Sequence, residues 1–303
     1  TMSQSNLRNL GVAHGNYDAE WAGRQFTLIR DDISTYGDST NEAFAQYAQQ
    51  SGMRHPPIIL GWRHETSDEG HQNQGGGNRR WGYWMNVVGN WGLPQPIVFE
   101  GMSFQVGFGA FRIPNAKQFN QYVSGKYYDP VFYAPKDTVV MPLIESCLED
   151  PGEFCLNGGQ TNTYWSSYCL SPAAMFNPDV MRNEARGGWQ DPWSLAAGFS
   201  SPSVSQALYP AMKTRMIEHH WLQQRRAECN PTFSGPHSPY DECEPYYFNH
   251  GRESQPVALW YDGHVETIGV REAEQADKRV RAQTGGNESG QAEYGLWSRD
   301  TPL

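Results

Sequence analysis

The sequence predicts an α+β fold with a helix at the N-terminus, short strands, a β-hairpin near the C-terminus and long structured loops. Near the N-terminus, apolar side chains recur every three or four residues, which is typical of an amphipathic helix. Near the C-terminus, an Asp-Gly pair separates two apolar runs, which is typical of a hairpin. The loops are indicated by 31 Gly and 20 Pro, which accompany 11 Trp, 16 Tyr and 13 Phe. So many aromatic residues indicate a folded chain, because disordered chains are poor in them.

The N-terminal helix is predicted over residues 3–22. Its buried stripe is expected to contain Leu7, Leu10, His14, Tyr17 and Trp21. These positions share one face of a helix with 3.6 residues per turn. Gly23 is the expected stop, because glycine readily takes the left-handed conformation that ends many helices. The helical spacing of apolar side chains begins within the first residues, so we expect residues 1–23 to continue a helix that begins upstream.

The hairpin is predicted over residues 256–268, with Asp262 and Gly263 as a two-residue turn. A type I′ turn needs positive φ at both central positions, which Asp and Gly tolerate. This loop length places Tyr261 opposite His264. An isolated hairpin is only marginally stable in water, so these strands must belong to a larger sheet or lie under a helix.

Between these ends, the pattern predicts a globular head over residues 24–284, followed by a polar tail over residues 285–303. Helical segments are expected at residues 41–50, 117–123 and 272–282. Strands are expected at residues 58–62, 97–113, 127–137 and 164–175, and at the centre of 209–226. The apolar segment 139–144 is expected to be an edge strand or a break, because Pro142 cannot donate a hydrogen bond to a sheet.

The charge balance argues against two classes of partner. The 303 residues carry a formal net charge of −10 and include no dense block of Lys and Arg. Nucleic acid and anionic membranes are therefore not expected as main partners. No window approaches the roughly eighteen apolar residues that a membrane span needs, so no span is predicted.

Several tryptophans lie in loop-like segments rich in Gly, Asn or Pro. They are Trp81, Trp84, Trp91, Trp189 and Trp193. Because Trp is enriched at the buried centres of protein interfaces, these side chains are candidates for contacts between copies of the chain. Two alternatives remain open, namely packing within the domain and a platform that binds a polysaccharide.

The five cysteines include two pairs that each bracket a loop. Cys147 and Cys155 enclose LEDPGEF, and Cys229 and Cys243 enclose NPTFSGPHSPYDE. Each pair is predicted to be a disulfide, which requires an oxidising, extracytoplasmic compartment. The alternative is that these residues are buried free thiols of a cytosolic protein. Cys169 is left over and is expected to be buried.

Two groups of titratable residues are candidates for a metal site. One consists of Glu218, His219 and His220, and the other of His250, Asp262 and His264. A metal site needs three or more such ligands converging within about 2.0–2.5 Å of the ion. Alternatively, the histidines bond to loop backbone or belong to a catalytic site. The sequence contains no nucleophile elbow, P-loop or dinucleotide-binding glycine motif, so no enzyme is predicted.

Three segments carry a family resemblance. Residues 6–23 (NLRNLGVAHGNYDAEWAG), 131–137 (VFYAPKD, with Ala134 where a cysteine is common) and 250–263 are similar to parts of bacterial type IV pilin-like and type II secretion pseudopilin-like proteins. The first resembles the second half of the long N-terminal helix of that family. The last resembles the H-x9-D-G motif of the prepilin-type processing-associated subgroup, with eleven intervening residues here. The hydrophobic first half of the helix has no counterpart, so we expect it to be removed, disordered or dispensable for assembly through the head.

The resemblance implies a helix packed on an antiparallel sheet, secretion to the cell surface or beyond, and no catalysis. It also makes calcium a candidate cofactor, because calcium often holds loops in pseudopilins, but no cofactor is assigned. The leading hypothesis is a structural subunit that polymerises with itself into an extracellular filament, pseudopilus or tube through non-closing contacts. The alternatives are a surface carbohydrate-binding module and a metal-dependent hydrolase.

Overall fold

A computed structural model of the chain describes residues 2–26, 31–52, 58–62, 80–83, 115–135, 137, 140–155, 166–180, 182–188, 190–192, 194–218, 228–229, 244–245, 255–269, 272, 276, 279, 282–283 and 285. The strand expected at residues 97–113 and all but the first residue of the expected tail lie outside this part of the chain.

The described residues form both helices and strands, which confirms the α+β class. The helices are α1 (Met2–Glu20), α2 (Thr40–Ser51), α3 (Lys117–Asn120), α4 (Met141–Leu148) and α5 (Pro172–Met175), with 3₁₀ helices at Asp31–Tyr36, Pro130–Phe132, Pro178–Val180, Glu184–Arg186 and Val204–Gln206. The strands are β1 (Ile58–Trp62), β2 (Arg80–Tyr83), β3 (Tyr168–Leu170), β4 (Thr214–Glu218), β5 (Glu228–Cys229), β6 (Glu244–Pro245), β7 (Val257–Trp260) and β8 (Val265–Thr267).

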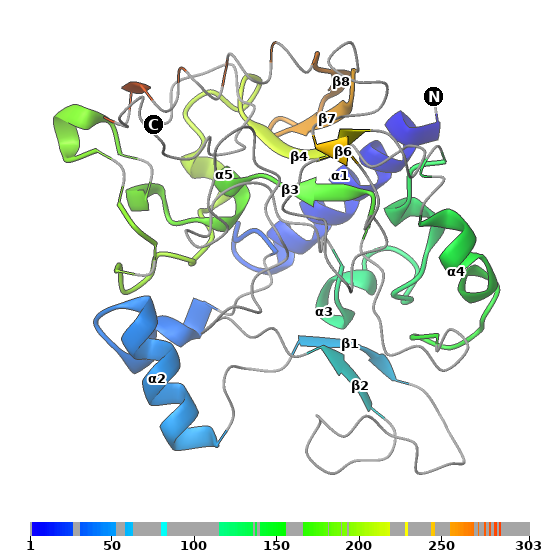
Figure 1. Cartoon of the computed structure of the whole chain (residues 1–303), viewed down its shortest axis with the longest axis horizontal. Helices are drawn as coiled ribbons and strands as arrows, with labels where there is room; N and C mark the ends of the chain where they lie inside the picture. The colour runs from blue at the N-terminus through cyan, green and yellow to red at the C-terminus, as the bar shows by residue number, and fades with distance from the viewer. Residues whose placement is uncertain are drawn as a thin grey trace.

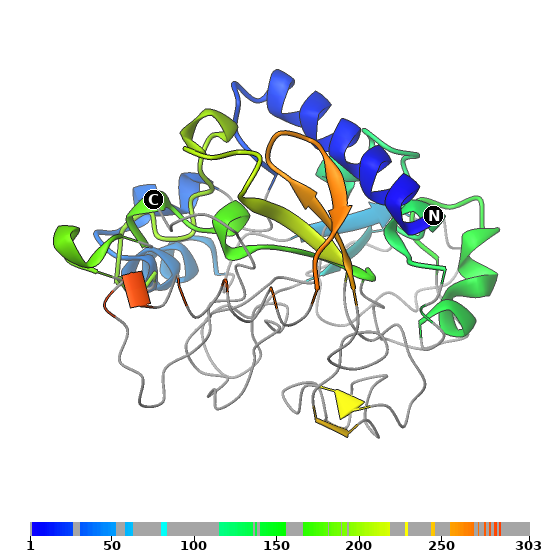
Figure 2. The same cartoon turned by 90° about the horizontal axis from the view of Figure 1, so that it is seen from above.

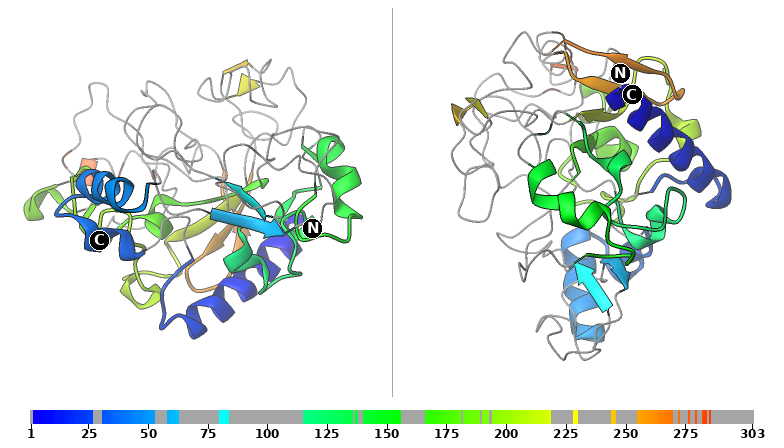
Figure 3. Two further views of the ribbon diagram at one scale, coloured as in Figure 1. Left: turned by 90° about the horizontal axis from the view of Figure 1, so that it is seen from below. Right: turned by 90° about the vertical axis from the view of Figure 1, so that its right-hand side faces the viewer.

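The main sheet has four strands in the order β3-β4-β7-β8, and each neighbouring pair is antiparallel. Helix α1 lies along one face of this sheet, over the β7–β8 hairpin (Figures 1 and 2). Strands β1 and β2 form a separate antiparallel pair, and β5 and β6 form a short parallel pair. Helices α2 and α4 lie at opposite ends of the molecule (Figures 1 and 3). The sheet and α1 therefore form the centre of the fold.

The buried stripe of α1 agrees with the sequence prediction at four of its five positions. Leu7, Leu10, His14 and Tyr17 are buried, whereas 46% of Trp21 is exposed. The difference arises because α1 ends at Glu20, so that Trp21 lies beyond the last helical turn. No helix within the described residues combines the length and apolar character needed to cross a membrane.

The hairpin has a three-residue loop instead of the expected two-residue turn. Trp260, not Tyr261, lies opposite His264, and the Trp260 N–H donates to the His264 carbonyl at 3.0 Å. Gly263 has a φ of +88°, and its N–H donates to the Trp260 carbonyl at 3.0 Å. This loop needs the left-handed conformation only at its last residue, which is glycine. The predicted register was therefore wrong by one residue.

Two segments expected to be extended contain helical turns. Residues 127–137 contain the 3₁₀ turn Pro130–Phe132, which Asp129 caps with its side chain. In the second segment, residue 140 leads into α4, and Pro142 occupies the first turn of that helix. Proline is tolerated there because the first N–H groups of a helix have no intrahelical partner. The strand predictions failed because the apolar residues outweighed these helix-starting signals.

Four other expected elements are present. Helices α2 and α3 and strands β1 and β4 lie within the predicted segments or within a residue or two of them. The strand predicted over residues 164–175 is confirmed only as β3, after which the chain turns into α5.

The end of α1 contains the one non-glycine residue with positive φ in the described part of the chain. The Gly23 N–H donates to the Asp18 carbonyl at 2.6 Å, and both Ala22, with a φ of +54°, and Gly23, with a φ of +80°, take the left-handed conformation. The glycine predicted as the stop thus supplies one of the two left-handed positions, and an alanine occupies the other. A left-handed conformation costs an L-residue about 1 kcal/mol or more.

We predict that Ala22→Gly raises the free energy of unfolding by about 0.5–1 kcal/mol, because glycine lacks the Cβ that makes this conformation costly. The opposite change is the control. Gly23→Ala places a Cβ at φ +80° and 3.0 Å from Ser203 Oγ, and should destabilise the protein. Urea unfolding followed by circular dichroism measures both effects. A destabilised Ala22→Gly variant would contradict the assignment of the helix end.

Candidate functional site

Three ionisable side chains meet inside the interface between α1 and β4. His14 and Asp18 lie one turn apart on α1, and Arg215 comes from β4. Arg215 Nη2 donates to Asp18 Oδ1 and Oδ2 at 3.1 and 2.9 Å and lies 3.3 Å from His14 Nδ1. None of the three residues is more than 7% exposed. The helix and the sheet are therefore joined by a buried ion pair.

A β-bulge directs Arg215 towards the helix. Leu259 faces α1, because a Cβ at Gly11 would meet its side chain at 3.0 Å, and Leu259 pairs with Met216. Strict alternation would send Arg215 to the opposite face from Met216. The register between β4 and β7 shifts between Thr214 and Met216, however, and such a bulge re-aims a side chain. The ion pair depends on this local irregularity.

The arrangement around His14 fixes its protonation. An arginine can only donate, so Nδ1 accepts from Arg215 and the ring proton lies on Nε2, which has no hydrogen-bond partner among the described residues. Phe119 packs against the ring, with centroids 4.3 Å apart. Burial first, and the positive charge of Arg215 second, hold the pKa of His14 well below its ordinary value. The imidazole is therefore neutral in the folded state.

The carboxyl group of Asp18 is subject to opposing effects. Burial raises its pKa, whereas the charge and the hydrogen bonds of Arg215 act to lower it. The guanidinium of Arg215 also lies 5.9 Å from the centroid of the Tyr261 ring, in the loop of the hairpin. One side chain of β4 thus contacts both α1 and the β7–β8 loop.

A second polar contact holds the start of α1. Ser3 Oγ donates to Glu218 Oε1 at 2.7 Å and lies 3.0 Å from the hydroxyl of Tyr168. The other carboxylate oxygen of Glu218 accepts from the backbone N–H of Val257 at 3.0 Å. The helix is therefore bonded to β3 and β4 near its first turn and to β4 near its last.

The structure separates the described members of the two predicted metal groups. Glu218 lies beside the first residue of β7. At the other end of β7, Asp262 lies in the hairpin loop and His264 directly follows that loop. Asp262 Oδ1 accepts from the His264 N–H at 3.0 Å and lies 2.5 Å from its Nδ1. His219, His220 and His250 lie outside the described residues. Within the described part, no three His, Cys, Asp or Glu side chains converge as a metal site.

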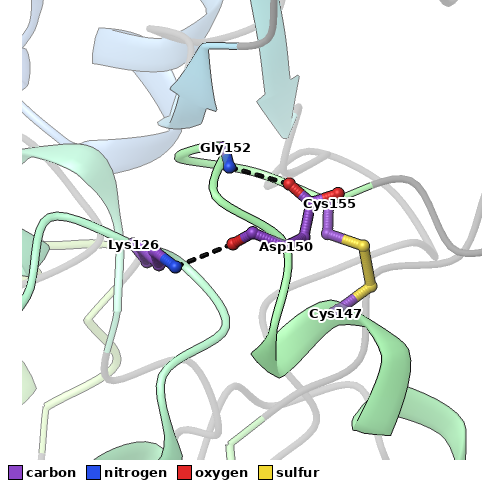
Figure 4. The surroundings of a disulfide bond; sticks show 5 residues. All are labelled: Lys126, Cys147, Asp150, Gly152 and Cys155. Carbon is purple, nitrogen blue, oxygen red and sulfur yellow. Dashed lines mark hydrogen bonds between the residues drawn. A yellow bond between two sulfur atoms is a disulfide. The ribbon is translucent and has the colours of Figure 1, made fainter.

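One predicted disulfide is present. Cys147 at the end of α4 is bonded to Cys155, and the two Cα atoms are 5.3 Å apart (Figure 4). The enclosed loop is ordered by Asp150, whose side chain accepts from the Gly152 N–H and whose carbonyl accepts from Lys126 Nζ, both at 2.7 Å (Figure 4). The disulfide and these two hydrogen bonds therefore hold the loop between the two cysteines in place.

Several predicted site residues fall outside the described part of the chain. They comprise the side chains of Cys229, Trp81 and Cys169, and all of Cys243, Trp84, Trp91, Trp189 and Trp193. The backbones of Cys229, Trp81 and Cys169 lie in β5, β2 and β3. The second disulfide and the tryptophan interface remain predictions.

A partly exposed aromatic cluster lies at the end of α1, where sequence reasoning did not place a site. The Trp21 ring stacks on Tyr17 with centroids 5.5 Å apart and an interplanar angle of 14°. Trp21 Nε1 donates to the Tyr122 hydroxyl at 3.2 Å, and this hydroxyl donates to Glu20 Oε2 at 2.5 Å. These contacts fix the orientation of the indole while almost half of it stays exposed.

Ser3, Asp18 and Arg215 are site residues that the sequence pattern did not predict. The available signal was that Ser3 and Asp18 share the face of α1 that carries Leu7 and His14, because they lie four residues from them. Polar residues on a buried face need partners inside the protein. No comparable signal identified Arg215, whose role depends on the bulge.

No protein-family model, curated protein or solved structure matches this chain.

We predict that His14 makes the folded state less stable in mild acid. Because its pKa is depressed in the folded state, only the unfolded chain takes up this proton as the pH falls below about 6.5. The free energy of unfolding should fall with a limiting slope of about 1.4 kcal/mol per pH unit from this residue. Urea unfolding at pH values between about 5 and 8 measures the slope, and His14→Gln should reduce it.

His264→Gln is the matched control, because His264 is a half-exposed residue of the hairpin. A slope that is unchanged in His14→Gln would contradict the buried neutral state of His14.

Proposed function

We propose that the chain is a non-enzymatic structural subunit that is secreted and polymerises with itself into a filament, pseudopilus or tube. The observation that carries this proposal is the docking of α1 along an antiparallel sheet whose last hairpin closes the fold. This arrangement agrees with the architecture that the resemblance to pilin-like proteins implies. It supports the proposal without identifying the family.

The buried contacts of α1 support a role as a rigid element. Ser3 fixes its start and Asp18 its end, and both contacts are removed from solvent. A helix held at both ends keeps its outer face in one position relative to the head. Repeated contacts between copies need such rigid surfaces, because flexible ones lose more entropy on association.

The disulfide supports an extracellular location. Cys147 and Cys155 are both buried and bonded in the structure. Disulfides persist mainly in oxidising compartments, where they stabilise loop-rich proteins. An extracellular or cell-surface subunit is the location that agrees best with this bond.

The proposal predicts polymers that form as the protein concentration rises. Sedimentation velocity of purified protein should show large species above a threshold concentration, and negative-stain electron microscopy should show filaments or tubes. Dilution below the threshold should return the monomer. A protein that remains monomeric at all accessible concentrations, under oxidising conditions, would exclude the proposal.

The Trp21 cluster favours a second candidate, a carbohydrate-binding module. A flat, partly exposed indole held by Tyr17 and Tyr122 offers an apolar face with a polar edge, which suits a sugar ring. The formal charge of −10 favours a neutral polysaccharide over an anionic one. Retention on a neutral polysaccharide gel that is lost in Trp21→Ala would support this candidate, and equal retention of both proteins would reject it.

A further inference from the structure

We propose that the contact between copies joins two different surfaces, namely the 208–212 loop of one copy and the outer face of α1 of the next. This inference rests on the proposed self-assembly and specifies which surfaces carry it. The outer face of α1 is defined by its exposed residues Ser5, Arg8, Asn9, Val12, Asn16 and Ala19.

The 208–212 loop is an unusual surface for a monomer. Its sequence is LYPAM, and all five residues are exposed, with exposed fractions of 65% for Leu208, 54% for Tyr209 and 41% for Met212. Runs of consecutive exposed apolar residues are rare unless they serve binding. The loop is therefore an interaction surface.

The loop is held in one shape. The N–H groups of Met212 and Lys213 both donate to the Tyr209 carbonyl, at 2.9 and 3.1 Å. The Pro210 carbonyl accepts from the N–H of Asp262 in the hairpin loop at 3.3 Å. A loop that is ordered before binding loses less conformational entropy in a complex.

The complementary surface is found on α1. Six large apolar side chains are exposed in the described part of the chain: Met2 and Val12 on α1, Trp21 just beyond its end, and Leu208, Tyr209 and Met212 on the loop. Val12 lies at the middle of the outer face and is 65% exposed. A second copy therefore supplies an apolar partner for the loop.

Charge restricts where two copies can meet. Each chain carries a formal charge of −10, so two copies repel unless uncharged surfaces meet. Residues 192–212 contain no charged side chain. On α1 the charged residues are Arg8, Asp18 and Glu20, and Asp18 is buried against Arg215. Both surfaces are thus nearly neutral patches on an acidic protein.

Because the two surfaces differ, the contact is heterologous. Each copy uses its loop on one neighbour and its helix on the other, so the contacts build an open filament where the rotation between copies does not close into a ring. This is the type of contact that a filament requires.

Two variants test the pairing, and each introduces one negative charge at an exposed position. Tyr209→Glu alters the loop, Val12→Glu alters the helix face, and Gln50→Glu in α2 is the matched control. A charge buried in an apolar contact should raise the threshold concentration for polymers by at least about tenfold. Sedimentation velocity is expected to show this for the first two variants and wild-type behaviour for the control, with circular dichroism confirming that all three fold.

Mixing the two variants tests the direction of the contact. Each still has one intact surface, so an equimolar mixture should form 1:1 dimers and no polymer. A mixture that stays monomeric would overturn the heterologous pairing. Polymers of both single variants at the wild-type threshold would overturn this inference and leave the proposed function standing, whereas a monomeric wild-type protein would overturn the proposed function itself.

Discussion

The guanidinium of Arg215, buried between α1 and the sheet, is the constraint on which the rest of the arrangement depends. A charge inside a protein needs a partner, and an unpaired one costs several kcal/mol. Here the partner, Asp18, belongs to the helix, so the ion pair forms only when α1 lies in one position. Such pairs add little stability relative to an apolar core, but they penalise wrong arrangements. We interpret this pair as the element that fixes the position of α1.

Other features of the fold follow from that position. The contact between Ser3 and Glu218 near the first turn sets the direction of the helix, and the loop residue Tyr261 covers Arg215 from the hairpin side. With one face of α1 committed to the sheet, the opposite face around Val12 remains exposed. The hairpin loop also bonds to Pro210 and so holds the 208–212 loop in place. The two surfaces proposed to meet between copies are therefore positioned by the same core.

The sequence predicted those features that depend on local pattern. The period of α1 and the Asp-Gly signal of the hairpin are properties of short segments, and the structure confirms both elements. It did not predict features that depend on pairing between distant segments. The bulge that directs Arg215 to α1 arises from the register of β4 against β7, and the hairpin register depends on a loop in which Gly263 alone takes positive φ. The helical start at Pro142 was visible in the sequence but was outweighed by its apolar neighbours.

A double-mutant cycle between Asp18 and Arg215 tests most directly whether the ion pair fixes the helix on the sheet. Asp18→Asn, Arg215→Met and the double variant are compared with the wild type by urea unfolding, and the half-exposed pair Lys117–Glu153 provides the control cycle. The account predicts a coupling energy above about 1.5 kcal/mol for the buried pair and at most about 1 kcal/mol for the half-exposed pair. Equal coupling energies in the two cycles would contradict it.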